Sequence, residues 1–591
     1  MNWFRAIAIG LLATTVLGGC AGRPDVRVEH RTIDTAPDPL SDDGPPLAAY
    51  GRAWRTTVTV DSGVPIYHLA GGHLMVVSEE AIEAYDARTG KPSWHYREPG
   101  REIDGFAATE GVIVAGFQTA SDNTAERHTF GLDAGTGELL WENTKDWNLT
   151  HDGEGTVYRP QEQADAADGV VAISTHDDEE RIGVEARTGD EVWKLTAGDT
   201  ADSECDPPEE VQPTDDPAEV SVLPVRFECE RDFTSDNSDE MLLAVDPGSG
   251  EPRWGRRLRS SVDLGSPTVR VRGGTTLVEP AGEHTTPELI GPNGRTLFKL
   301  KSGFCSVECG LYASDGWAAL AYAEETGQAA GGTATLAAVD LESGRTSRMP
   351  DPGRSRATYL TAAGKLYGLT TTYGWEPSVE ATDRLAPTGM TVVDVATKRV
   401  DDAPMPYPTH VLFSSPDGKV EEPVAVGGER WFTARQVLAP DVPADGHRAE
   451  VSSYAPERTS GPPELAGVSP EDWSDPCALL AKIPRGYHDT EPPEPAPALD
   501  LGDVRIRTMC SRYDVTVRIN WVAGTEQEAK RLFPDGKPST VGADEERESA
   551  DDTSMLYRVG RTIMQVDTLY GEQEDTIIRQ IVRSLREGPT T

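Results

Sequence analysis

Residues 86–94 read DARTGKPSW, and this short phrase decides the fold because the chain repeats it. It recurs as DAGTGELLW at residues 133–141, as EARTGDEVW at residues 185–193 and as DPGSGEPRW at residues 246–254. Every copy holds an acidic residue, a turn that ends in glycine, and a tryptophan four residues after that glycine. Self-similarity at a period of about 40–50 residues is typical of propellers and solenoids. The phrase therefore predicts a repeat architecture.

Each copy predicts a β-hairpin. An apolar run typical of a strand precedes the acidic residue. The carboxylate can accept hydrogen bonds from the N–H groups of the turn, and the glycine can adopt the positive φ that the turn requires. The tryptophan opens the outer strand and can cover the neighbouring sheet with a large apolar area. We assign a structural role, rather than a ligand-stacking one, to these residues of the phrase: Asp86, Gly90, Trp94, Asp133, Gly137, Trp141, Gly189, Trp193, Asp246, Gly250 and Trp254.

Three weaker copies continue the series. Residues 291–298 place Phe298 in the tryptophan position, residues 340–346 keep the acid and the glycine, and residues 394–399 have Lys398 in the glycine position. The seven turns are 44 to 61 residues apart. That spacing leaves room for about four strands in each unit, as a propeller blade needs.

Two fragments indicate one more unit. Residues 449–454 look like the strand before a turn, and residues 50–54 look like the end of the phrase with its first half missing. An N-terminal strand that completed the last blade would close the ring and remove an exposed sheet edge, which otherwise invites aggregation. We therefore predict an all-β propeller of four-stranded antiparallel sheets over residues 48–460, with eight blades favoured over seven.

Because several copies carry both the glycine and the tryptophan, residues 48–460 resemble the repeats of the pyrroloquinoline-quinone-like (PQQ-like) β-propellers of bacteria, the quinoprotein-dehydrogenase-like family. The resemblance implies the propeller fold. It implies no single activity, since enzymes, assembly lipoproteins and sensor domains all use this fold.

The N-terminus predicts a secreted, lipid-anchored protein. An apolar run over residues 6–16 is too short to span a bilayer, and the sequence LGGC follows it and ends at Cys20. This segment resembles the signal peptide and lipobox of bacterial lipoproteins, which implies removal of residues 1–19, diacylglycerol on Cys20 and an extracytoplasmic place at the cell membrane. The alternative is an ordinary secretory signal with an incidental cysteine. Residues 20–47 are polar and proline-rich, which predicts a flexible tether.

Six cysteines remain beside Cys20, an even number that an extracytoplasmic protein can pair as disulfides. The sequence leaves their connectivity open. A zinc site is an alternative for the closest two, but no further thiolate or imidazole lies at a matched spacing nearby. The positions suggest three local pairs: Cys205 with Cys229, Cys305 with Cys309, and Cys477 with Cys510.

The net charge is −44, from 99 acidic and 55 basic residues. This balance argues against nucleic-acid binding, which needs a basic footprint, and against electrostatic adhesion to an anionic membrane. It is typical of a solvated secreted surface. An acidic, proline-rich insertion at residues 198–219 offers carboxylates of the kind that calcium binds, but it has no spaced Asp-x-Asp-x-Asp-Gly loop. We therefore favour a solvated loop there.

A second domain follows a linker at residues 461–472. Residues 473–588 predict a small α+β domain with a short helix, a hairpin, two further strands and a C-terminal amphipathic helix. A bridge between Cys477 and Cys510 would join the first helix to the hairpin. The opening DPCALL resembles a domain of small secreted or lipid-anchored proteins of actinobacteria. That resemblance implies no activity.

The sequence holds no clear catalytic constellation. The adjacent cysteines and the calcium-side aspartate of quinoprotein dehydrogenases have no counterpart here. His68 and His73 flank a predicted turn, where strand-surface residues are more common than ligands. We therefore assign no catalytic, cofactor-binding or metal residue, while PQQ and calcium stay open as cofactors.

These observations favour a non-enzymatic, monomeric lipoprotein that binds an envelope protein or another ligand through the loops of its propeller. One alternative is a quinone- or metal-dependent oxidoreductase. Another is a sensor that recognises a small ligand in the central channel.

Overall fold

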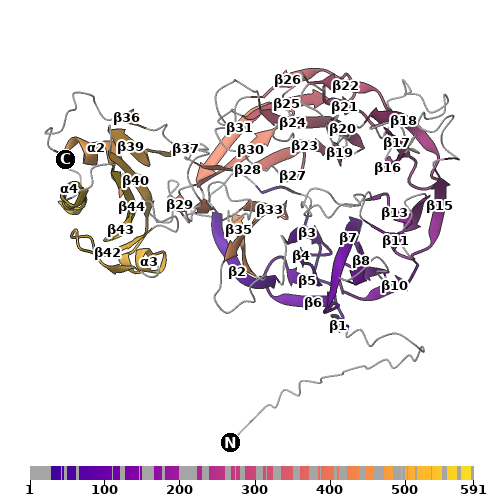
Figure 1. The fold of residues 1–591 in the computed structure, drawn as a ribbon, viewed down its shortest axis with the longest axis horizontal. Helices are drawn as coiled ribbons and strands as arrows, with labels where there is room; N and C mark the ends of the chain where they lie inside the picture. The colour runs from indigo at the N-terminus through magenta and orange to yellow at the C-terminus, as the bar shows by residue number, and fades with distance from the viewer. Residues whose placement is uncertain are drawn as a thin grey trace, which may run out of the picture.

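The computed structural model describes residues 28–41, 43–45, 50–60, 65–109, 111–119, 127–145, 147–149, 166–175, 180–196, 198, 222–228, 239–259, 268–272, 274–279, 286–300, 310–314, 316–323, 334–349, 360–371, 384–386, 388–404, 409–411, 422–437, 447–456, 472–483, 494–495, 499–501, 504–512, 515–533, 536–548, 555–568 and 574–587. Cys20, Cys205, Cys229, Cys305 and Cys309 lie outside these residues, so their lipidation and pairing stay predictions. Sheets arranged around a ring form the larger part of the molecule, and a smaller domain stands beside the ring (Figure 1).

Among the described residues, eight antiparallel sheets of three to five strands follow one another around the ring. Successive strands within a sheet run from the centre of the ring to its rim (Figure 1). The first sheet contains β1 (Glu29–Arg31), β3 (Ile66–Ala70), β4 (His73–Val77), β5 (Ala81–Asp86) and β6 (Pro92–Arg97), and the second contains β7 (Arg101–Thr109), β8 (Val112–Thr119), β9 (Arg127–Asp133) and β10 (Leu139–Asn143). The third contains β11 (Trp147–Asn148), β12 (Ala166–Ala167), β13 (Val170–Thr175), β14 (Glu180–Glu185) and β15 (Glu191–Thr196). The fourth contains β16 (Leu223–Glu228), β17 (Asp239–Val245) and β18 (Pro252–Arg259).

The second half of the ring repeats this pattern. The fifth sheet contains β19 (Thr268–Arg272), β20 (Thr275–Glu279), β21 (Glu288–Ile290) and β22 (Thr296–Lys299), and the sixth contains β23 (Gly310–Ser314), β24 (Trp317–Ala323), β25 (Ala334–Asp340) and β26 (Thr346–Arg348). The seventh contains β27 (Leu360–Ala362), β28 (Lys365–Thr371), β30 (Thr388–Asp394) and β31 (Arg399–Pro404). The eighth contains β33 (Glu422–Gly427), β34 (Arg430–Val437), β35 (His447–Pro456) and β2 (Tyr50–Val60).

The N-terminal strand β2 completes the eighth sheet. It pairs antiparallel with β35, from Tyr50 opposite Pro456 to Val60 opposite His447. The prediction that an N-terminal outer strand completes the last sheet is confirmed. The two ends of the chain segment that forms the ring are thus joined through backbone hydrogen bonds, which leaves no gap in the sequence of sheets.

Apolar clusters fill the space between consecutive sheets. Trp94, Phe117 and Phe130 belong to the cluster between the first and second sheets. Trp54 and Phe432 belong to the cluster that joins the eighth sheet to the first. Six further clusters join the pairs in between. Burial of apolar area between sheets, worth roughly 25 cal/mol per Å², is therefore the main force that holds the ring together.

The two ends of the ring differ in the length of their connections. At one end, two residues join β3 to β4, β7 to β8, β12 to β13, β19 to β20, β23 to β24, β27 to β28 and β33 to β34, and the repeated phrase joins the next two strands of the first seven sheets. At the other end, the connections are longer, for example residues 260–267 after β18 and residues 324–333 after β24. We call these ends the short-turn face and the long-connection face.

Residues 28–41 and 43–45, which belong to the predicted tether of residues 20–47, lie against the ring. β1 pairs with β6 at the rim of the first sheet, with Glu29 opposite Arg97, and the chain after β1 then crosses several turns of the short-turn face. The low apolar content of the segment rules out a core of its own, but its backbone groups still form hydrogen bonds with the ring. We call residues 28–41 and 43–45 the strap.

The C-terminal domain has the predicted α+β architecture. Seven of its described strands form one antiparallel sheet in the order β36-β39-β40-β44-β43-β42-β41, and β37 pairs with β38 in a second sheet. The core of this domain is separate from those of the ring. Its elements are α2 (Pro476–Ala481), β36 (Glu494–Pro495), β37 (Leu499–Leu501), β38 (Val504–Ile506), β39 (Met509–Arg512), β40 (Val515–Val522), α3 (Glu526–Arg531), β41 (Lys537–Pro538), β42 (Glu545–Glu548), β43 (Met555–Val559), β44 (Thr562–Thr568) and α4 (Glu574–Glu587).

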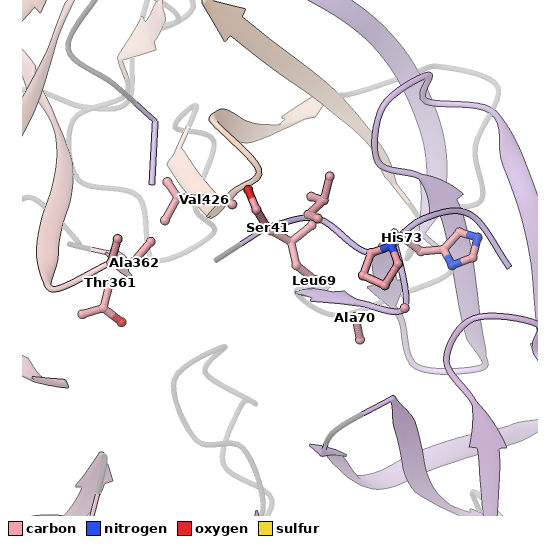
Figure 2. Close-up of a pocket in the computed structure, with 13 residues that line it drawn as sticks. Ser41, Leu69, Ala70, His73, Thr361, Ala362 and Val426 are labelled. Carbon is pink, nitrogen blue, oxygen red and sulfur yellow. The ribbon is translucent and has the colours of Figure 1, made fainter. Parts of the chain in front are cut away.

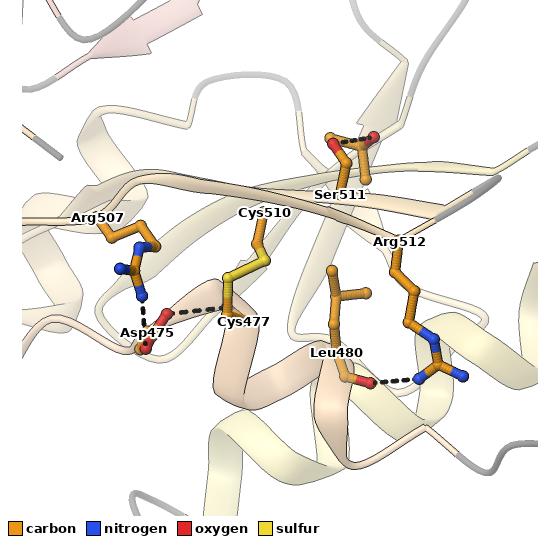
Figure 3. The surroundings of a disulfide bond; sticks show 8 residues. Asp475, Cys477, Leu480, Arg507, Cys510, Ser511 and Arg512 are labelled. Carbon is orange, nitrogen blue, oxygen red and sulfur yellow. Dashed lines mark hydrogen bonds and ion pairs between the residues drawn. A yellow bond between two sulfur atoms is a disulfide. The ribbon is translucent and has the colours of Figure 1, made fainter. Parts of the chain in front are cut away.

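A disulfide between Cys477 and Cys510 joins α2 to β39, with the Cα atoms 5.2 Å apart (Figure 3). This pair is confirmed as predicted. Asp475 caps α2, because its carboxylate accepts a hydrogen bond from the backbone N–H of Cys477 at 2.9 Å. The same carboxylate pairs with Arg507 at 3.3 Å. The bridge therefore ties to the sheet a short helix that also buries Leu479 and Leu480 in the core of the domain.

A hairpin from the ring reaches this domain. β29 (Arg384–Ala386) and β32 (Thr409–Val411) branch from the seventh sheet as an antiparallel pair, and β29 contacts β40. β31 also contacts β37.

Candidate functional site

The acidic residue of the repeated phrase caps the turn that follows it. One carboxylate oxygen of Asp133 accepts hydrogen bonds from the backbone N–H groups of Gly135 and Thr136, both at 3.0 Å. Asp246 does the same in its own turn, at 3.1 and 2.9 Å. The predicted role of these carboxylates is confirmed, and it is structural.

The tryptophan of each clear copy docks on the turn of the next sheet. A Cβ atom at Gly137 would lie 2.6 Å from the indole of Trp94, and the indole Nε1 donates a hydrogen bond to the carbonyl of Ala134 at 3.1 Å. We call this arrangement the Trp–Gly clasp. It recurs with donor distances of 2.7 to 3.0 Å in four further pairs: Trp54 on Gly90, Trp141 on Gly189, Trp193 on Gly250 and Trp254 on Gly294.

The clasp ends after the fifth sheet. Phe298 occupies the tryptophan position in the register of β22, opposite Leu289, but the atoms nearest to Gly344 belong to Leu297, at 3.6 Å or more. Lys398 keeps the left-handed turn conformation of the glycine that it replaces, with φ of +58°. The later, weaker copies of the phrase therefore keep the turn but do not form a Trp–Gly clasp with the next sheet.

The strap crosses four sheets on the short-turn face. The N–H of Ile33 donates to Thr136 of the second sheet at 3.0 Å. Arg88 of the first sheet donates to the carbonyls of Asp38 and Pro39. Farther on, the N–H groups of Gly428 and Glu429 in the eighth sheet donate to Ser41 and Asp43, at 2.8 and 3.1 Å. Gly44 then lies against Tyr367 of the seventh sheet.

A cavity of about 330 Å³ opens beside the strap on this face (Figure 2). Ala362 and Val426, from the seventh and eighth sheets, form one side, and Leu69 of the first sheet faces them from the other. Ser41 of the strap closes the top of this view. The lining residues are small and, apart from His73, uncharged, so the cavity offers few charged groups to hold a ligand.

His68 and His73, which flank the first turn of the first sheet, serve packing. His73 is fully buried and its ring points away from the cavity (Figure 2), which corrects its predicted place on the strand surface. Its Nδ1 donates to the carbonyl of Ala134 at 3.2 Å, and burial lowers its pKa. His68 lies edge-on to Phe106, with ring centres 6.1 Å apart.

A buried ionic cluster lies at the opposite end of the ring, between the first and second sheets. The carboxylate of Glu98, which is 1% exposed, accepts hydrogen bonds from Tyr96 at 2.7 Å, His128 Nδ1 at 2.8 Å and Arg101 at 3.1 Å. The other ring nitrogen of His128 lies 3.5 Å from Glu142. Burial alone would raise the pKa of Glu98, but the hydrogen bonds from His128 and Tyr96 and the charge of Arg101 hold it below its usual value.

This cluster fixes strand ends beneath the long-connection face. All partners of the Glu98 carboxylate are protein groups, so it holds the ends of β6, β7 and β9 in place and does not present a free acid or base. Other sheets carry ion pairs near the same end, among them Arg226 with Glu240, and Arg270 with Glu279 at 3.6 Å. No sequence motif predicts this cluster, because Glu98, Arg101 and His128 do not follow a recognisable spacing.

The search for metal ligands adds no site. The described part of the chain contains no group of three or more His, Cys, Asp or Glu residues suited to hold a metal ion. The PQQ and calcium alternatives stay predictions. No described helix is both long and apolar enough to cross a membrane.

Part of the repeat region is similar to a known protein family. Residues 51–148 match the family model described as outer membrane protein assembly factor BamB, so the predicted resemblance to PQQ-like propeller repeats is confirmed there. No curated protein matches the chain significantly. Similar solved structures include BamB from Moraxella catarrhalis (15% identity, TM-score 0.33, covering 70% of this chain and 100% of that one) and the WD40 domain of SCAP from fission yeast (8% identity, TM-score 0.32, covering 72% and 98%).

Proposed function

We propose that this chain, whose residues 51–148 are BamB-like propeller repeats, is a non-enzymatic binding module at the cell envelope. Its ring is a closed propeller of eight blades, lipid-anchored through Cys20, and its long-connection face recognises a protein partner. The BamB-like repeats support a scaffold role, because the matched family is described as an assembly factor.

The difference between the two end faces carries this proposal. On the short-turn face, two-residue turns, Trp–Gly clasps and the strap use the available groups for internal contacts. On the long-connection face, longer connections start and end at strands held by buried ion pairs such as Glu98 with Arg101. Recognition residues are commonly found on loops that a rigid scaffold positions.

Crosslinking on intact cells tests the proposal. The full chain is compared with a variant in which residues 324–333, which connect β24 to β25 on the long-connection face, are replaced by a short glycine–serine linker. The matched control is Glu251→Lys, an exposed change in a repeated turn on the other face. We expect the native chain and the control to capture the same envelope protein and the linker variant to lose it at least tenfold. Capture of no protein by the native chain would contradict the scaffold role.

The cavity beside the strap supports a second candidate, recognition of a small ligand. Its volume of about 330 Å³ falls at the lower end of the range typical of ligand pockets, roughly 300–1,000 Å³. Bound ligand would raise the melting temperature of the full chain. We expect small-molecule fractions of the cell envelope to raise it for the native chain and not for Ala362→Trp, which fills the cavity. No rise for the native chain would contradict this candidate.

A further inference from the structure

The strap shortens the distance that the ring can move from Cys20. Eight peptide units separate Cys20 from Val28, the first residue of the strap, and a fully extended chain spans at most about 3.6 Å per residue. The reach is therefore at most about 30 Å. If every residue up to β2 were free, the same estimate would give about 100 Å. The contacts of the strap thus decide how far from its anchor the ring can lie.

The strap meets the ring first at the rim of the first sheet. β1 lies along β6, with His30 opposite Tyr96 and Arg31 opposite His95. His30 also contacts the carbonyl of Gly137 at 2.7 Å. These contacts hold the start of the strap on one side of the ring, far around the circle from β22 (Figure 1).

The side chains at this rim suit a phospholipid surface. Val28 is 46% exposed, and only one other large apolar side chain among the described residues, Val192, is exposed as well. The same rim carries exposed cations, with Arg31 farther along β1 and Lys91 at the opposite end of β6 from Val28, although the chain as a whole carries a net charge of −44. A rim with an exposed apolar side chain and exposed cations matches the boundary between acyl chains and phosphate headgroups.

We propose that the strap fixes the orientation of the ring at the membrane, with the rim formed by β1 and β6 next to the phospholipid headgroups. This inference rests on the proposed lipid anchor at Cys20. The ring then lies within about 30 Å of that anchor. Because the strap also covers the short-turn face, a partner of the long-connection face must belong to the same membrane or to its immediate surface.

Energy transfer to the bilayer tests this orientation. The lipidated full chain is reconstituted in zwitterionic phosphatidylcholine vesicles that contain an acceptor-labelled lipid. A ketone-bearing amino acid at position 91 or position 295 carries the donor dye. These positions are matched, since Lys91 and Arg295 both follow the turn glycine of a repeat and both are exposed, on different sides of the ring. A third chain carries a 20-residue glycine–serine insertion between residues 27 and 28, which lengthens the tether and leaves the strap intact.

We expect transfer from position 91 to exceed that from position 295 severalfold, and the insertion to abolish the difference. Equal transfer from the two positions in vesicle-bound protein would overturn the orientation alone. So would a difference that persists after the insertion. A chain that stays out of the vesicle fraction would overturn the anchor at Cys20, and the orientation with it.

Discussion

Five joints of the ring carry a Trp–Gly clasp, whereas the joints between the fifth, sixth, seventh and eighth sheets carry none among the described residues. At a clasped joint, an indole fills the space that a Cβ atom would need and donates to a carbonyl of the next sheet, as Trp254 does on Gly294. At the other joints, aliphatic clusters or the edge-on pair of Tyr367 and Trp431, 5.5 Å apart, fill the same space.

The difference teaches that closure of the ring does not need an identical joint at every position. Apolar burial is non-directional, so any side chains of suitable volume can join two sheets. The clasp adds a directed hydrogen bond and a close fit, which fix the angle and register of one sheet against the next. We therefore expect the clasped half to be the more rigid part of the ring.

The largest effect should come from removal of a clasp indole. Trp254 is fully buried, so Trp254→Ala should lower the free energy of local opening by about 3–5 kcal/mol. Phe298→Ala, at the equivalent position of the next joint, should cost less than about 2 kcal/mol because its ring is only half-buried. Native-state hydrogen exchange of the flanking strands measures both. Equal losses would show that the two kinds of joint do not differ.

The turn glycines offer a second comparison. Gly137→Ala places a Cβ atom 2.6 Å from the ring of Trp94 at φ of +74°, so strain and overpacking together should cost about 3 kcal/mol. Gly344→Ala meets no atom within 3.6 Å at φ of +66° and should cost about 1 kcal/mol. Hydrogen exchange in β10 and β26 reports each change. A larger loss at Gly344 would contradict the role of the clasp.

A third substitution separates the two parts of the clasp. Trp94→Phe keeps most of the apolar contact but removes the donor to the carbonyl of Ala134. That carbonyl keeps the hydrogen bond from His73, so the loss should be about 1 kcal/mol. Urea unfolding monitored at the first two sheets measures it. A loss as large as that from Trp94→Ala would mean that the hydrogen bond, and not the packing, dominates the joint.

The smallest effect concerns pH and should be the same in both halves. A hydrogen bond from Arg253 lowers the pKa of Asp246 in the clasped half, and one from Ser343 lowers the pKa of Asp340 in the other. Because each pKa is lower in the folded state, the stabilisation is present above the unfolded value, about 3.9, and is lost as the pH falls through the folded value.

Asp340→Asn and Asp246→Asn should each flatten the loss of stability below about pH 4, by no more than about 0.5 kcal/mol because the carboxylates are exposed or half-exposed. Urea titrations between pH 2 and pH 7 measure this. A steeper loss of stability in either variant would contradict the assigned sign.

The repeated phrase allowed much of the fold to be predicted. The capping role of Asp133, the packing role of Trp94 and the closing strand around Trp54 all follow from residue types at fixed spacing. The expectation that His73 lies on a turn or strand surface was wrong, because the residues beside a turn do not indicate which neighbouring sheet will cover them. The buried ionic cluster around Glu98 was harder to predict from the sequence. Glu98 and His128 are 30 residues apart and meet only because two sheets pack face to face.

The sequence by itself determined the hairpin of each repeat, and it suggested the local pair of Cys477 with Cys510 that the structure contains. These features depend on contacts within a short stretch of chain or on a motif that a stretch can carry. Only the tertiary structure decided that the polar, proline-rich strap binds the ring and that the clasp stops after Gly294. Those outcomes depend on backbone groups and side chains that belong to different sheets. The closed ring brings these groups together, and no local sequence pattern predicts their contacts.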